Sequence, residues 1–66
     1  MSSSQLRIME CAINAAREAA AGRVDVATAE RVYLGAKRAG VDRDHLAPAR
    51  RFLAAARRAE LAGVMA

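Results

Sequence analysis

Three side-chain types that often carry out chemistry in enzymes occur once each in this chain, as Cys11, Tyr33 and His45. A cysteine beside a histidine would supply a nucleophile and its base. Catalysis also needs a third group that orients the base and a pocket that holds the substrate. The sequence offers no orienting group for this pair and few large side chains from which to build a pocket. We therefore predict that the protein is not an enzyme and has no small-molecule substrate.

The same residues argue against a bound metal or nucleotide cofactor. Metal sites in proteins usually employ three or four ligands at recognisable spacings. Cys11 and His45, with scattered carboxylates, do not form such a spacing, and no glycine-rich phosphate loop is found. We expect neither a metal nor a cofactor.

The most distinctive chemical pattern is a set of four arginines near the end of the chain. Arg50/Arg51 and Arg57/Arg58 are seven residues apart, so in a helix they form two rows on one side. Glu60, at i+3 from Arg57, is the one acidic residue close enough along the helix to neutralise any of them. Between the rows lies an apolar strip without an obvious place in a core, formed by Ala47, Ala54 and Leu61. Arginines around apolar residues are typical of protein-binding hot spots.

The spacing of the apolar residues predicts the helices that must position these arginines. Apolar residues recur at intervals of three and four through roughly 4–21, 25–39 and 46–62. The predicted core faces include Leu6, Met9, Ile13, Ala16, Ala20, Val26, Ala29, Val32, Tyr33, Ala36, Ala39, Ala49, Phe52, Leu53, Ala56 and Ala59. We predict an all-α fold in which residues 1–66 form a single domain, a small three-helix bundle.

Serine, glycine and proline mark the expected helix ends. The segment 2–5, Ser-Ser-Ser-Gln, has the spacing of a capping box. Gly22, Gly40 and Gly63 each follow an apolar period, where glycine commonly ends a helix. Proline is tolerated in a first helical turn but not deeper, so the third helix is expected to begin next to Pro48.

Composition restricts the partners. Eleven basic residues against seven acidic ones leave a net charge of +4, which favours an acidic protein surface or DNA. Ten of the eleven basic residues are arginine, a choice that codon use in a GC-rich genome would also explain. No apolar run approaches the ~20 residues of a membrane-spanning helix, and the N-terminus does not resemble a signal peptide. With a single cysteine, we expect a cytoplasmic protein that does not associate with membranes.

A small core is expected, because 18 of the 66 residues are alanine. Such a core rarely leaves more than ~3–5 kcal/mol of net stability, so we expect a homodimer. Leu34 lies off the core face of the second helix, one heptad after Ala27, and is either a lone exposed leucine or part of a second contact surface. The candidate partner-binding residues are Leu34, Arg50, Arg51, Arg57, Arg58 and Leu61.

The segment 36–46, AKRAGVDRDHL, resembles the helix-turn-helix of tetracycline-repressor-type regulators. It has a small residue at Ala36, a glycine four residues later, a hydrophobic residue at Val41, and Leu46 five residues after that. In such a motif these positions let two helices approach, make the turn and pack the second helix on the first. The resemblance implies a DNA-binding transcriptional regulator, with backbone contacts from Arg38, Arg43, Arg50 and Arg51.

Two functions therefore stay open. The first is a small regulatory protein that docks its arginine-rich helix on an acidic macromolecule, preferentially a protein. The second is the helix-turn-helix DNA binder. Pro48, Asp42 and Asp44 discriminate between them. Pro48 would fall inside the recognition helix, and the two aspartates would put negative charges where the start of that helix faces phosphates. A membrane-surface helix ranks third, since the apolar face of the last helix lacks bulky anchors.

Overall fold

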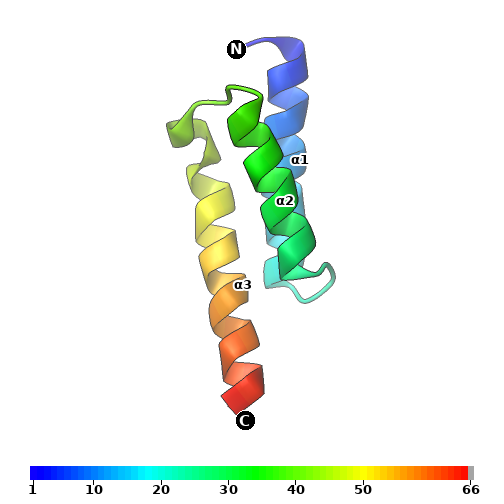
Figure 1. The fold of residues 1–66 in the computed structure, drawn as a ribbon, viewed down its shortest axis with the longest axis vertical. Helices are drawn as coiled ribbons and strands as arrows, with labels where there is room; N and C mark the ends of the chain where they lie inside the picture. Colours follow the sequence, from blue (N-terminus) through cyan, green and yellow to red (C-terminus); the bar gives the residue numbers. More distant parts are fainter. Residues whose placement is uncertain (66) are drawn as a thin grey trace.

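Three α-helices and one short 3₁₀ turn make up the fold. The computed structural model describes the backbone of residues 1–65 and the side chains of residues 1–63. The elements are α1 (Ser3–Ala20), α2 (Val26–Arg38), η1 (Arg43–Leu46) and α3 (Ala47–Met65). α1 packs against both other helices, and α2 runs opposite to α1 and α3 (Figure 1). The predicted all-α three-helix bundle is confirmed.

The first turn of α1 is closed by the expected capping box. The backbone amide of Gln5 donates to Ser2 Oγ at 3.1 Å, and the amide of Ser2 donates to Gln5 Oε1 at 2.9 Å. Gln5 Nε2 also donates to the carbonyl oxygen of Ala39 at 3.1 Å. This bond ties the start of α1 to the end of α2.

Two of the predicted glycine stops are present. The Gly40 amide donates to the Lys37 carbonyl, and the Val41 amide donates to the Ala36 carbonyl, the two bonds of a Schellman motif. Gly22 closes α1 with the same pair of bonds. Both glycines have positive φ, 79° at Gly22 and 87° at Gly40, where a side chain would strain the backbone.

The third predicted stop is wrong, because α3 passes through Gly63 and continues to Met65. A glycine stops a helix only where it adopts positive φ, and among the described residues Gly22 and Gly40 alone do so. Pro48 lies in the first turn of α3, as its missing amide hydrogen requires.

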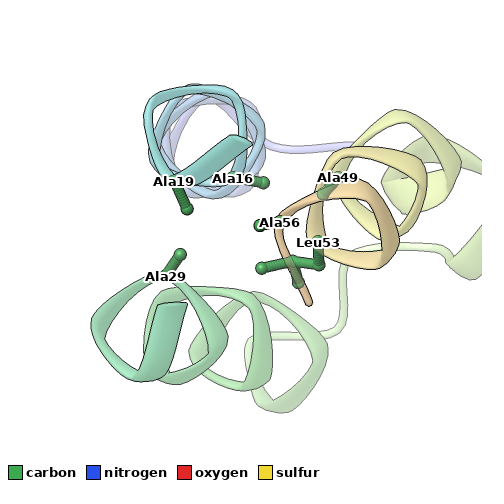
Figure 2. Packing of buried hydrophobic residues seen from close by; sticks show 6 residues of the cluster. All are labelled: Ala16, Ala19, Ala29, Ala49, Leu53 and Ala56. Carbon is green, nitrogen blue, oxygen red and sulfur yellow. The ribbon is translucent and has the colours of Figure 1, made fainter. Parts of the chain in front are cut away.

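Alanine dominates the core. Figure 2 shows one cluster, where the three helices meet through Ala16, Ala19, Ala29, Ala49, Leu53 and Ala56. A second cluster lies around Leu46, the largest of the fully buried side chains. Small side chains let helices approach closely but remove little apolar surface from water.

Two residues of the predicted core are exposed. Leu6 is 43% exposed, because the buried face of α1 is centred on its alanines and Leu6 lies to one side of that line. Ala59 is exposed because it lines an open hollow beside the α1–α2 turn, and residues 57–63 are all exposed. The C-terminal end of α3 extends beyond that turn (Figure 1). No helix in the described part of the chain combines the length and the apolar character that crossing a membrane requires.

Candidate functional site

The outer face of α3 carries a shallow hollow of about 370 Å³. We call it the arginine groove, and it is lined by Ala47, Arg50, Arg51, Ala54 and Arg58. These residues recur at intervals of three, four and one along one helix, so α3 alone builds the groove. The two alanines leave room between the arginine side chains. Three of the four arginines predicted from the sequence therefore share one surface.

The charges of the arginine groove are not neutralised within the described part of the protein. No carboxylate lines the groove. None of the ion pairs among the described residues includes Arg50, Arg51 or Arg58. Three neighbouring cations without a counter-charge among the described residues produce a positive local potential, which attracts negatively charged groups.

Arg57 has a different role. Its Nε donates to Glu30 Oε1 of α2 at 3.1 Å, and this ion pair joins α2 to α3. The hydrogen bond and then the negative charge of Glu30 raise the pKa of Arg57 above its ordinary value. The sequence spacing pointed to Glu60 as the neighbour of Arg57, but Glu60 lines a hollow between α3 and the α1–α2 turn. Glu30 was missed because its proximity arises only from the packing of two helices.

The two candidate leucines lie on different helices. Leu61 is 63% exposed and follows Arg58 by three residues, so it extends the line of the arginine groove toward the end of α3. Leu34 is 46% exposed on α2 and is not part of the groove lining. The structure thus leaves two separate apolar contact points.

A second hollow, of about 410 Å³, lies where α2, the α2–η1 link and the start of α3 meet. We call it the cationic pocket, and it is lined by Tyr33, Lys37, Val41, Arg43 and Arg50. Three of these five side chains are cations and none is acidic. The ammonium of Lys37 lies 5.9 Å from the centre of the Tyr33 ring, a cation–π contact.

Sequence reasoning singled out Arg43 and Arg50 of this pocket but not Lys37 or Tyr33. Lys37 and Tyr33 share one face of α2, four residues apart. No spacing rule relates them to Arg43 and Arg50, because the Gly40 turn brings the three elements together. Arg38, the last residue of α2, is exposed and does not line the pocket.

Among the described residues, His45 and Cys11 each lie beside residues of their own segment. His45 Nδ1 lies 3.6 Å from Asp42 Oδ2. His45 belongs to η1, and Asp42 is the residue immediately before η1. Cys11 is exposed in a hollow formed by residues of its own helix. No group of three or more potential metal ligands occurs among the described side chains.

The segment that resembles a helix-turn-helix forms a tight corner. Ala36, Val41 and Leu46 are buried in one cluster, which is the packing that the resemblance implies for them. A 3₁₀ turn rather than an α-helix follows the glycine, and α2 and α3 run in opposite directions (Figure 1). The helices of a helix-turn-helix cross at about 90–120°. The resemblance remains a prediction.

Comparison of the chain with protein-family models, with curated proteins and with solved structures gives no match. The described residues form a small helical protein with two hollows lined by basic side chains.

Proposed function

We propose that this protein is a small regulatory protein that binds an acidic partner protein through the arginine groove. One observation carries the proposal: Arg50, Arg51 and Arg58 surround a strip of alanine, and no carboxylate lines the groove. Guanidinium groups form paired, charge-assisted hydrogen bonds with carboxylates. The matching partner surface is a segment with two or more Asp or Glu side chains around a small apolar residue.

Leu61 favours a protein over a nucleic acid as that partner. It is a large apolar side chain, 63% exposed, on the same line of α3 as the groove. Protein interfaces combine an apolar centre with arginine and are depleted in lysine. The groove with Leu61 has that composition, whereas a duplex backbone would contact the arginines and leave the leucine in water.

Duplex DNA is the second candidate partner, and one observation favours it. Arg43 and Arg50 line one hollow at the start of α3, and Arg50 Nη1 donates to the backbone carbonyl oxygen of Arg43 at 2.8 Å. Asp42 and Asp44 are exposed beside them and would repel phosphates. We therefore rank DNA below an acidic protein.

The proposed setting is the cytoplasm, because a single exposed thiol at Cys11 suits a reducing compartment. We also propose that the protein is a homodimer. Its core contains few large side chains, with Leu46 the largest that is fully buried, and a second copy would cover further apolar surface.

Site-specific photo-crosslinking in the source cell tests the arginine groove. A photoreactive residue in place of Ala54, inside the groove, is compared with the same residue in place of Asn14, exposed on α1. We expect the Ala54 position to capture a protein through a peptide rich in Asp and Glu, and Arg51→Glu/Arg58→Glu to abolish that product.

Equal products from both positions, or products that survive the charge reversal, would refute the proposal. Cross-links to DNA from Ala54 alone would favour the second candidate instead.

A further inference from the structure

The cationic pocket gathers three cations from three different elements. Lys37 comes from α2, Arg43 from η1 and Arg50 from α3. We propose that this pocket binds a small phosphate-bearing anion, such as a phosphate monoester or a diphosphate. The proposal goes beyond the protein partner of the arginine groove, with which the pocket shares only Arg50.

Electrostatics makes the empty pocket unfavourable and the occupied one favourable. Like charges that line one hollow repel each other, and no carboxylate in the lining offsets them. Asp42 and Asp44, the acidic neighbours of Arg43 in the chain, are exposed and do not line the pocket. An anion in the pocket would convert this repulsion into attraction for all three cations.

The position of Lys37 has a simpler explanation that does not extend to the other cations. A lysine in the last turn of a helix interacts favourably with the terminal carbonyl groups. Arg43 and Arg50 belong to η1 and α3 and gain nothing from the end of α2. Arg50 is also held by the Arg43 carbonyl, and an anion would account for the convergence of all three cations on the same hollow.

The pocket is held in shape before any ligand arrives. Arg50 Nη1 donates to the Arg43 carbonyl at 2.8 Å, and the Lys37 ammonium lies over the Tyr33 ring. Val41 forms the apolar wall of the pocket. It is buried, and its backbone amide donates a hydrogen bond to the Ala36 carbonyl in the Schellman motif. Groups that are already ordered lose less conformational entropy on binding.

The size and the donors of the pocket identify the class of anion. Its volume of about 410 Å³ falls in the range of small-ligand pockets and exceeds what a chloride ion fills. Two guanidinium groups and an ammonium supply many hydrogen-bond donors in several directions. A phosphate group presents several acceptor oxygens and matches that set better than a planar carboxylate does.

Calorimetric titration at fixed ionic strength tests the pocket, with pyrophosphate and inorganic phosphate as probes and acetate as the control anion. We expect one pyrophosphate per chain and no measurable acetate binding. Lys37→Gln and Arg43→Gln should each weaken pyrophosphate binding about tenfold, because each removes a charged hydrogen-bond donor. Arg31→Gln, an exposed residue of α2 outside the pocket lining, is the matched control and should change the affinity less than about twofold.

Three results would overturn the inference: equal weakening by all three variants, acetate binding as strong as that of pyrophosphate, or no pyrophosphate binding at all. Dependence on Lys37 and Arg43 for a duplex oligonucleotide but not for pyrophosphate would assign the pocket to nucleic acid instead. Circular dichroism melts of each variant confirm that the fold is intact.

The test separates this inference from the arginine-groove proposal. Arg51→Gln/Arg58→Gln, which adds no negative charge beside Arg50, should leave pyrophosphate binding within about twofold. Lys37→Gln should leave the Ala54 cross-link in place, because Lys37 does not line the arginine groove. Loss of one activity without the other shows which of the two proposals has failed.

Discussion

Gly40 is the residue on which the corner between α2 and α3 depends. Its φ of 87° is open to glycine but strained for other residues, and a Cβ atom there would lie 3.2 Å from Gln5 Nε2. Gln5 uses that same nitrogen to hold the carbonyl of Ala39. One position therefore controls a turn, a cap and a contact between helices.

We predict that Gly40→Ala lowers the free energy of unfolding by about 1–2 kcal/mol, the cost of a left-handed conformation for an L-residue. Gly35→Ala is the matched control, because Gly35 lies inside α2 with open space around its Cα. That change should raise stability by about 0.5–1 kcal/mol, since glycine is unfavourable within a helix. Urea denaturation followed by circular dichroism measures both, and equal effects of the two substitutions would contradict the role of Gly40.

Sequence patterns predicted the helices of this protein better than their ends and their buried faces. Periodicity predicted three helices, and the positions of Gly22 and Gly40 predicted two of their ends. The predicted helix end at Gly63 was wrong because the sequence around it resembles that around the other two glycines. A glycine that ends a helix differs from one inside a helix by its backbone conformation, which the sequence pattern does not give. The prediction that Leu6 is a core residue was wrong, because periodicity identifies the apolar side of a helix but not which residues on that side lie closest to the neighbouring helices.

The candidate sites differ in whether one helix or several elements build them. The arginine groove could be predicted because one helix builds it, and helical spacing alone relates its residues. The Arg57–Glu30 ion pair and the cationic pocket could not, since each joins residues from separate elements. Their proximity depends on how α2 and α3 pack, which no local pattern of the chain contains.

At the η1–α3 junction, Leu46 fills the cluster that holds the corner together. We predict that Leu46→Ala destabilises the protein by about 2–5 kcal/mol, through lost apolar burial and the cavity left behind. That amount is comparable to the ~3–5 kcal/mol expected for so small a core, so the cooperative melt should be largely lost.

Leu6→Ala is the matched control for Leu46, because Leu6 is an exposed leucine on α1 and lies outside the proposed dimer face. Its effect should stay within about 0.5 kcal/mol. A Leu46→Ala variant that melts at the temperature of the unmodified protein would show that this cluster contributes little to stability.

For the whole molecule, we predict that self-association and partner binding respond to salt in opposite directions. Two arginine grooves would repel each other, so a second copy is expected on the face of Leu34, where Arg31 and Arg38 flank the leucine at three and four residues. Added salt screens those charges and should strengthen the dimer, while it weakens attraction to an acidic partner.

Sedimentation equilibrium across a salt series checks the dimer. We expect dimers at micromolar concentration and dissociation on Leu34→Ser. Leu6→Ser, which alters an exposed leucine of α1, is the control and should leave the dimer intact. A monomer at millimolar concentration, or equal effects of the two substitutions, would contradict the dimer.

The central proposal is that the outer face of α3 docks an acidic protein, and charge reversal on that face tests it most directly. Arg51 and Arg58 are exposed and outside every described ion pair, so Arg51→Glu/Arg58→Glu should melt like the unmodified protein. Arg7→Glu/Arg17→Glu makes the same change in net charge on α1, away from both the arginine groove and the Leu34 face.

The decisive measurement is the affinity of these two variants and of the unmodified protein for the partner captured through Ala54. We predict that reversal in the groove weakens binding about a hundredfold or more, because like charges then face each other across the interface. The control pair should weaken it less than about tenfold, through net charge alone. Equal losses for the two variants, or unchanged binding by Arg51→Glu/Arg58→Glu, would show that the arginine groove is an ordinary solvated surface.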